Sequence, residues 1–222
     1  MIFALITQSA LSTPDETHKY PAGDGSDLTV HAFLPDKSTR SGKAAIFYFG
    51  GGWRVGSPEQ FFPFCQALKT RGIACFAPDY RVSSRQGTDP IDALHDAQSA
   101  YQWLVSKADE FGVDKSQIYV GGGSAGGHLA AAVTLLPNKS ITQAPAGMLL
   151  FNPAVDIGRS TRIQEMFRNQ AEQYSPIEFV RPSLPGAWIV HGTADKIVPH
   201  STVVDFCQRM ESAGNVCELL GF

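Results

Sequence analysis

The chain has 222 residues, of which 43% are hydrophobic and 18% charged, and its formal net charge is −3. This size and apolar content fit one globular domain with a substantial core. The small net charge and the lack of basic runs exclude an electrostatic footprint for nucleic acid or an anionic membrane. We therefore expect a small, neutral or locally polar substrate as the partner; the oligomeric state stays open.

The first twelve residues are apolar, but they are too short to span a bilayer and lack the basic start of a signal peptide. One interpretation is the end of a longer export signal, which would make the protein periplasmic or secreted; the localisation stays open. We expect residues 1–15 to be a tail or signal remnant and residues 16–222 to form a single domain. No other stretch approaches transmembrane length.

Two strands with a turn at 23–25 are predicted over 16–34, followed by a polar linker. Continuous apolar strands then alternate with helices. Strands are predicted over 43–49, 73–77, 147–151, 187–191 and 216–222, and a further strand leads into the glycines at 121–123. Helices are predicted over 58–70, 91–111 and 201–213, and a further helix begins after Ser124. This alternation predicts an α/β fold with a mostly parallel sheet and helices on both faces.

No strand is predicted between 158 and 185, where 163–173 has the pattern of a short amphipathic helix. Insertions at such a place commonly cover an active site. Four cysteines form two equally spaced pairs, Cys65 with Cys75 and Cys207 with Cys217, and they have no metal-ligand spacing. We expect buried free thiols, with two local disulfides and an exported protein as the alternative.

A buried-strand pattern breaks at 121–127 through glycines around one serine and continues as a helix. The spacing Gly122-x-Ser124-x-Gly126 is that of a nucleophile elbow, in which glycine-sized neighbours let a serine stand exposed at a sharp strand-to-helix turn. The helix start also directs N–H groups and a positive dipole end at this point. The motif therefore predicts Ser124 as a nucleophile.

The same glycines also satisfy Gly121-x-Gly123-x-x-Gly126, the spacing of a dinucleotide-binding turn. That turn belongs after the first strand and requires an acidic residue about 20 positions further on. Here the next strand, 147–151, runs into Asn152 instead. The context favours the nucleophile elbow, and we expect neither an organic cofactor nor a metal.

Two further groups of residues follow predicted strands, where open α/β sheets bind ligands. Gly51 and Gly52 have unobstructed backbone N–H groups, which together with that of Ala125 would hold the negative charge of a tetrahedral intermediate. The alternative for the glycines is a simple tight turn. Asp195 follows a later strand and would orient a histidine; its alternative is a solvated loop carboxylate.

Together these motifs resemble the α/β-hydrolase superfamily, in particular small esterases of the hormone-sensitive-lipase-like and feruloyl or acetyl-xylan esterase type. The resemblance extends from about Leu28 to Phe222, and the Gly-Gly-His-Leu-Ala continuation of the elbow is specific. It implies the α/β-hydrolase fold and a structural role for the segment 79–81. The site residues that it implies are the nucleophile Ser124, the acid Asp195 and the oxyanion donors Gly51, Gly52 and Ala125.

The chain departs from this family at two places. Phe49 precedes the three glycines where the family often has histidine, which bears on the rigidity of that loop. Family members carry the triad histidine in the loop after the final strand, whereas this chain stops at Phe222 on that strand, so the last strand–loop–helix part of the fold is expected to be missing. Of the six histidines, His200 comes nearest to a substitute; we expect His128 to pack and His191 to stabilise a turn.

The sequence thus predicts a serine hydrolase that cleaves small carboxylic esters, with a carbohydrate-linked ester as one option, and that is impaired here because it lacks the triad base. The alternatives are a catalytically inactive hydrolase-like binding protein and a peptidase of the same fold. We expect Asp195 to have no imidazole partner. We also expect the end of the last strand to approach an unusually open Ser124 cleft.

Overall fold

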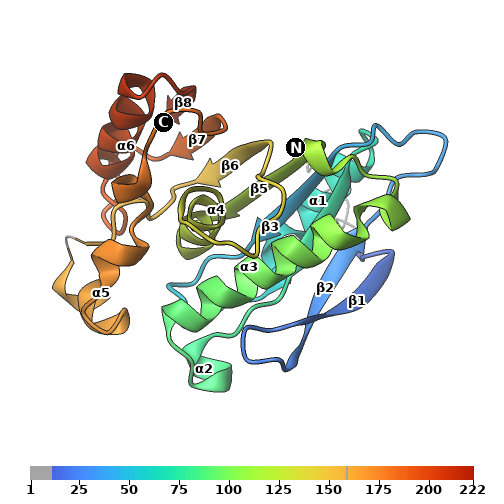
Figure 1. Cartoon of the computed structure of the whole chain (residues 1–222), viewed down its shortest axis with the longest axis horizontal. Coiled ribbons are helices and arrows are strands. Elements are labelled where there is room, and N and C mark those ends of the chain that lie inside the picture. Colours follow the sequence, from blue (N-terminus) through green and yellow to red (C-terminus); the bar gives the residue numbers. More distant parts are fainter. Residues whose placement is uncertain (1–11, 159) are drawn as a thin grey trace, which may run out of the picture.

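The computed structural model describes residues 12–158 and 160–222. Its central element is an eight-stranded sheet (Figure 1). Residues 1–11, which hold most of the predicted tail, lie outside the described residues. The strand order is β1-β2-β4-β3-β5-β6-β7-β8. The strands are β1 (Glu16–Pro21), β2 (Asp27–Phe33), β3 (Ala44–Tyr48), β4 (Ala74–Pro78), β5 (Ile118–Gly123), β6 (Gly147–Phe151), β7 (Ala187–His191) and β8 (Cys217–Gly221).

Helices connect most of these strands, as the alternating pattern predicts. The α-helices are α1 (Phe62–Lys69), α2 (Ser83–Gln86), α3 (Pro90–Lys107), α4 (Ala125–Leu135), α5 (Thr161–Met166) and α6 (His200–Ser212). Short 3-10 helices are η1 (Pro58–Phe61), η2 (Ala108–Phe111), η3 (Lys115–Gln117), η4 (Ala171–Tyr174) and η5 (Pro176–Phe179). The short helix α2 is absent from the sequence-based prediction.

The sheet is parallel from β4 to β8, and only the pairs β1–β2 and β2–β4 are antiparallel. All five residues of β3 and of β4 are buried, which explains their continuous apolar sequences. The prediction of a mostly parallel α/β sheet is therefore confirmed. Because the carboxyl ends of parallel strands meet at one edge, the loops after β3, β5, β6 and β7 share that edge.

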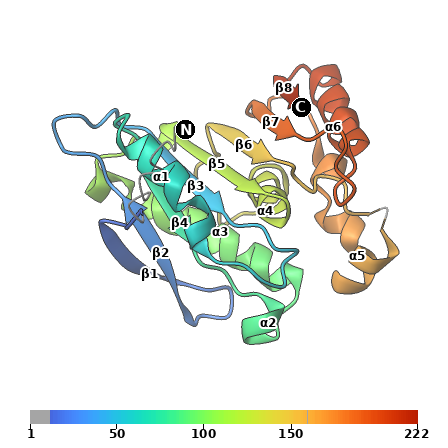
Figure 2. The same ribbon diagram turned by 180° about the vertical axis from the view of Figure 1, so that it is seen from behind.

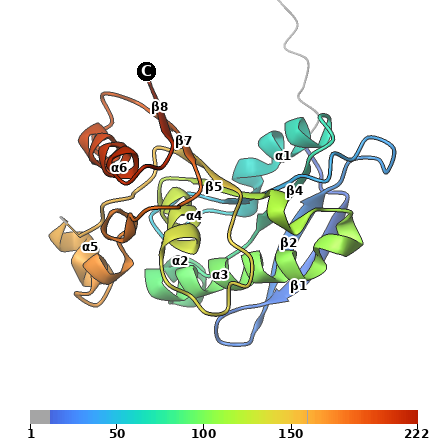
Figure 3. The same ribbon diagram turned by 45° about the horizontal axis from the view of Figure 1, so that its top comes forward.

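Helices cover both faces of the sheet, as predicted (Figure 3). Helix α1 and η1 lie on one face, where the rings of Phe47 and Phe61 stack with centroids 5.0 Å apart. Helices α3, α4 and α6 lie on the other; for example, the Tyr48 hydroxyl donates to the carbonyl oxygen of Ala97 in α3 at 2.8 Å. Seen from behind, α1 lies across β4 and also contacts β2 (Figure 2).

The face that carries α1 is open over β7 and β8 within the described residues, whereas Phe61 and Phe64 pack on Phe151 of β6. Register places Leu149 beside Trp188, and strand alternation puts Leu220 on the same face. Trp188 is 39% exposed and Leu220 is 64% exposed. A parallel sheet normally buries both faces, so this half of the sheet exposes apolar side chains that a covering element would bury.

All four cysteines are disulfide-bonded, so the expectation of free thiols is wrong. Each bond joins a helix to the strand that follows it: Cys65 in α1 to Cys75 in β4, and Cys207 in α6 to Cys217 in β8. Because each helix packs back on its strand, the Cα atoms of the pairs lie 5.0 and 5.2 Å apart, within the usual disulfide range. The equal spacing reflects this repeated helix–strand geometry.

We expect the double variant Cys65→Ala/Cys75→Ala to lose about 2–3 kcal/mol of unfolding free energy, because a disulfide that closes a short loop restricts the unfolded chain by about this amount. Urea unfolding followed by circular dichroism measures the loss. The Cys207→Ala/Cys217→Ala variant should lose a similar amount, since both loops have a sequence separation of 10. Equal unfolding free energies for wild type and variants under non-reducing conditions would contradict the assigned bonds.

The amphipathic helix predicted over 163–173 is shorter in the structure. Helix α5 ends at Met166, and the separate 3-10 helix η4 begins at Ala171. Between them Arg168 and Asn169 both have positive φ values, 54° and 59°. Two successive left-handed residues end the helix, which the apolar pattern alone does not reveal.

Candidate active site

Ser124 lies at the turn between β5 and α4 with φ 52° and ψ −116°, a backbone conformation that non-glycine residues rarely adopt. Its amide donates to the carbonyl oxygen of Phe151 at 2.9 Å, and its own carbonyl accepts from the amide of His128 at 2.9 Å. The side chain is half-buried and reachable from solvent. This is the strained strand-to-helix turn that the elbow motif predicts.

The glycines of the motif are required by close backbone packing. A Cβ atom at Gly126 would overlap the carbonyl oxygens of Tyr48 and Phe49, and one at Gly122 would overlap the carbonyl oxygen of Gly126. Gly123 differs, because its nearest neighbours would lie 3.8 Å away in ordinary contact. Gly126 of α4 therefore lies too close to the end of β3 for a side chain, and Gly122 of β5 lies too close to α4. These two contacts explain the spacing Gly122-x-Ser124-x-Gly126.

The loop after β3 turns through Gly51 and Gly52, whose φ values are 132° and 62°. The backbone N–H groups of Gly51, Gly52 and Ala125, the first residue of α4, have no hydrogen-bond acceptor among the described residues. The Gln60 side chain fixes the start of the loop by accepting from the Gly50 amide at 2.5 Å. Three unpaired N–H groups beside a helix N-terminus suit the binding of a negatively charged oxygen.

Phe49, which precedes the three glycines, is held firmly. Its ring stacks on that of Tyr80 with centroids 3.9 Å apart, and the Tyr80 hydroxyl donates to its carbonyl oxygen at 2.7 Å. Burial raises the pKa of Tyr80, so the hydroxyl stays a donor. Aromatic stacking and this hydrogen bond thus anchor the start of the glycine loop.

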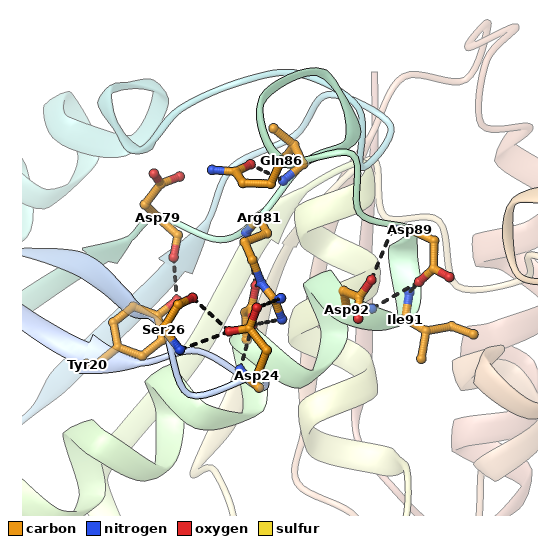
Figure 4. A network of polar contacts seen from close by, with 12 residues as sticks. Tyr20, Asp24, Ser26, Asp79, Arg81, Gln86, Asp89, Ile91 and Asp92 are labelled. Carbon is orange, nitrogen blue, oxygen red and sulfur yellow. Dashed lines mark hydrogen bonds and ion pairs between the residues drawn. The ribbon is translucent and has the colours of Figure 1, made fainter.

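The segment 79–81 forms a buried network behind this loop (Figure 4). The Arg81 guanidinium donates to both carboxylate oxygens of Asp96, each at 2.8 Å, and also pairs with Asp24. Asp96 is fully buried and accepts the amide of Gly23 as well, at 2.8 Å. These contacts tie the β1–β2 turn to α3, in agreement with the structural role implied for this segment.

Asp195 lies in the loop after β7, on the same sheet edge as Ser124. Its Oδ1 atom accepts from the amides of Ile197 at 2.8 Å and Val198 at 3.1 Å, and these bonds lower its pKa. The carboxylate therefore stays ionised at neutral pH. Asp195 and Phe222 line a hollow of about 560 Å³ whose other walls include Phe151, the residue bonded to the Ser124 amide. Ser124 itself is not among its lining residues.

The expectation that Asp195 has no imidazole partner is wrong. His191 Nε2 lies 3.7 Å from Asp195 Oδ2, within ion-pair range but too far for a hydrogen bond. His191 is buried, and its Nε2 is 2.8 Å from the carbonyl oxygen of Val198. Because the loop 192–198 folds back over the end of β7, this histidine fixes the loop that carries Asp195, as expected for a turn-stabilising residue.

His128 is fully buried one turn along α4, with its ring against Trp53 and Phe167 at centroid distances of 5.2 and 5.5 Å. Its Nε2 lies 2.8 Å from the carbonyl oxygen of Tyr174. Burial is the main cause that lowers its pKa to about 4, so the ring is neutral at neutral pH. The expected packing role is confirmed.

This pKa predicts a pH dependence of stability. The unfolded chain binds a proton at His128 near pH 6.5, whereas the folded chain does so near pH 4. The unfolding free energy should therefore fall as pH decreases from 6.5 to 4, by at most about 1.4 kcal/mol per pH unit. Urea unfolding at several pH values should show a shallower slope for His128→Gln, which keeps a donor for Tyr174. Identical slopes would contradict the assignment.

His200 begins α6 on the face of the sheet opposite α1, and its ring lies 5.6 Å from that of His191. Its Nε2 is buried without a partner among the described residues. The other three histidines lie on β1, β2 and α3. In the part of the chain that the structure describes, no hydrogen bond or ion pair joins any of the six histidines to the Ser124 side chain.

Two features of this edge have no counterpart in the sequence prediction. Asn152 directly follows β6 with φ 39° and lines the Asp195 hollow, and Gln60 anchors the glycine loop. An Asn after an apolar strand is a weak signal for a left-handed residue.

The part of the chain that the structure describes contains no cluster of three or more His, Cys, Asp or Glu side chains that could hold a metal ion. None of its helices has the length and apolar character needed to span a membrane.

Comparisons with known proteins give consistent relatives. Residues 45–182 match a family described as having the α/β hydrolase fold. The chain is 29% identical over 208 residues to esterase LipC of Mycobacterium tuberculosis, covering 80% of this chain and 50% of that protein. It is 25% identical over 210 residues to an acetylxylan esterase of Xylanibacter ruminicola, covering 88% of this chain and 42% of the relative.

Solved structures are similar over nearly the whole chain. Apo esterase 2 from Thermogutta terrifontis has a TM-score of 0.89 and 36% identity, covering 98% of this chain and 86% of that one. The same esterase phosphonylated by sarin gives a TM-score of 0.89 and 35% identity, with the same coverage. The chain spans 34 to 50% of the length of the curated relatives that it matches. On the matched residues and the observed sheet, this chain belongs to the α/β hydrolase fold family.

Proposed function

We propose that the chain forms the core of a serine hydrolase that cleaves small carboxylic esters through an acyl-enzyme. The main support is the position of Ser124 in a strained turn beside the unpaired N–H groups of Gly51, Gly52 and Ala125. The named esterase and carboxylic ester hydrolase relatives support the same class of reaction. Asp195 lies on the same sheet edge and is the acid of the proposed triad.

In the proposed reaction, the Ser124 hydroxyl attacks the ester carbonyl while an imidazole base takes its proton. The negative charge that develops on the carbonyl oxygen is held by the backbone N–H groups of Gly51, Gly52 and Ala125. Collapse of the tetrahedral intermediate releases the alcohol, which receives the proton from the imidazolium. Water then attacks the acyl group on Ser124, and the carboxylic acid leaves.

The base is the missing component within the described residues. We propose that it enters the hollow of about 560 Å³ beside Asp195, where Oδ2 is the carboxylate oxygen that the loop amides leave free. His191 cannot supply it, because its Nε2 is committed to Val198 inside the protein. The lack of a histidine at Ser124 is also the observation that favours the rival function, a catalytically inactive binding protein.

Two disulfides in a chain of this size favour an oxidising compartment. We therefore propose that the protein is exported. The substrate proposed is an ester of a short acyl group, since the Thermogutta esterase has been solved with propionate and with butyrate bound. A carbohydrate-linked ester remains an option that the acetylxylan esterase relative supports.

Hydrolysis of a p-nitrophenyl short-chain ester, with and without free imidazole, tests the proposal. Imidazole small enough to enter the Asp195 hollow should raise turnover by the wild type well above that of Ser124→Ala, which reports the reaction of imidazole in solution. Asp195→Asn should lose most of the enhancement, because the carboxylate orients the ring and stabilises its charge. Equal rates for wild type and Ser124→Ala at every imidazole concentration would favour the binding-protein alternative.

A further inference from the structure

A second hollow, of about 400 Å³, lies between the end of the glycine loop and α5. Its walls are Trp53 and Arg54 from that loop, Thr88 and Asp89 before α3, and Arg162 and Glu165 from α5, together with Ser83, Pro90 and Met166. It shares no lining residue with the hollow beside Asp195. Trp53 follows Gly52 directly, so their Cα atoms are only about 3.8 Å apart.

Two walls of this hollow carry buried polar atoms without partners. Trp53 is 4% exposed, and its indole Nε1 donates no hydrogen bond among the described residues. The Thr88 hydroxyl is also buried and unpaired. The Trp53 ring is fixed in place, since His128 and Phe167 both pack against it. Buried donors normally find an acceptor, so two orphaned donors at one hollow indicate a ligand that accepts hydrogen bonds.

The charges around the hollow favour an anion. Arg54 and Arg162 are exposed, and neither forms an ion pair with a described residue. Asp89 is already neutralised, because its Oδ2 accepts from Arg168 at 2.5 Å while its Oδ1 caps α3. Figure 4 shows Asp89 in this capping position at the start of the helix. Glu165 is the remaining acid, so the two arginines leave a net positive charge.

We infer that this hollow binds a carboxylate that the ester substrate carries in addition to its ester group. A guanidinium presents paired N–H donors that match a carboxylate, and the indole N–H and the threonine hydroxyl add neutral donors. The inference rests on the proposed function and narrows its substrate class to half-esters and other acidic esters. Because Trp53 and Arg54 line the hollow and directly follow Gly52 in the chain, the hollow borders the proposed oxyanion loop.

Binding to the Ser124→Ala protein tests this inference without requiring turnover. Isothermal titration would compare monomethyl succinate, which carries an ester and a carboxylate, with dimethyl succinate, its neutral analogue of similar shape. We expect the Ser124→Ala protein, whose hollow is unchanged, to bind monomethyl succinate at least tenfold more tightly than dimethyl succinate. The double change Arg54→Gln/Arg162→Gln should remove this preference while leaving the affinity for dimethyl succinate within about twofold.

Arg71→Gln is the matched control, because Arg71 is an exposed arginine without an ion pair in the connection between α1 and β4. It should leave both affinities unchanged. Trp53→Phe keeps a ring against His128 but removes the indole N–H, and it should weaken monomethyl succinate binding by several-fold. Equal affinities for the two probes, no binding of either, or a preference that survives the double change would overturn the inference. If Ser124 of the wild type proves unreactive in the hydrolysis test while the preference for monomethyl succinate persists, only the hydrolase proposal is rejected.

Discussion

Gly126→Ala should abolish the folded state, whereas Gly123→Ala should leave it nearly unchanged. The added methyl group at Gly126 would overlap the backbone carbonyl oxygens of Tyr48 and Phe49, which belong to the central part of the sheet and its following loop. Backbone atoms cannot rotate away as a side chain can, so β3 and α4 would have to separate. We expect a loss of more than about 4 kcal/mol, in the range reserved for severe core changes.

The control, Gly123→Ala, changes the same motif by the same atom. Its Cβ would meet Phe151 and Phe61 at 3.8 Å, an ordinary contact distance. Circular dichroism and urea unfolding of the two variants give the comparison directly. If Gly126→Ala folds with a stability close to that of Gly123→Ala, the close approach of β3 to the elbow is incorrect, and with it the physical reason for the Gly122-x-Ser124-x-Gly126 spacing.

Asp96→Asn should cost about 3–5 kcal/mol of unfolding free energy. The Asp96 side chain is fully buried and accepts two side-chain bonds from Arg81, whose own side chain is 8% exposed. Neutralising the acid leaves a buried guanidinium with only the half-exposed Asp24 as a partner, and an uncompensated buried charge is strongly destabilising. One of the two acceptor oxygens would also become an NH2 donor that faces the guanidinium.

Asp27→Asn is the matched control, because Asp27 pairs with Lys19 where both side chains are exposed, 61% and 72%. That exposed pair should contribute less than about 1 kcal/mol. Chemical unfolding in parallel measures both costs. A loss of under about 1 kcal/mol for Asp96→Asn would contradict the structural role of Arg81 behind the glycine loop.

Most strands were predictable from the sequence because buried parallel strands have continuous apolar runs bounded by turn residues. The elbow was predictable for a different reason. Its backbone segments approach so closely that a side chain at Gly122 or Gly126 would overlap neighbouring carbonyl oxygens, so any chain with this turn requires glycine there. In contrast, the end of α5 depends on two left-handed residues, Arg168 and Asn169, of which only the asparagine is a weak signal for that conformation. Local sequence carries no clear signal for such a stop.

The features that the sequence missed are set by tertiary packing. Equal cysteine spacing could not distinguish buried thiols from disulfides, because the deciding quantity is how closely each helix returns to its strand. The approach of His191 to Asp195 depends on the fold of the intervening loop. The hollow at Trp53 likewise exists because α5 lies beside the glycine loop, far away in the sequence. Residue types and their spacing led to the hypotheses for Ser124 and Asp195, while the surroundings of both residues depend on the tertiary fold.

The central claim is that Ser124 is the nucleophile of a hydrolase whose base belongs beside Asp195. The most direct measurement is covalent labelling with a fluorophosphonate, with the modified residue identified by mass spectrometry of peptides. The Thermogutta relative has been solved phosphonylated by sarin, a reagent of the same chemistry. We predict one phosphonyl group on the peptide that contains Ser124, forming faster as free imidazole is added and slower in Asp195→Asn. No adduct at Ser124 with imidazole present, or the same adduct yield on other serines, would contradict the account.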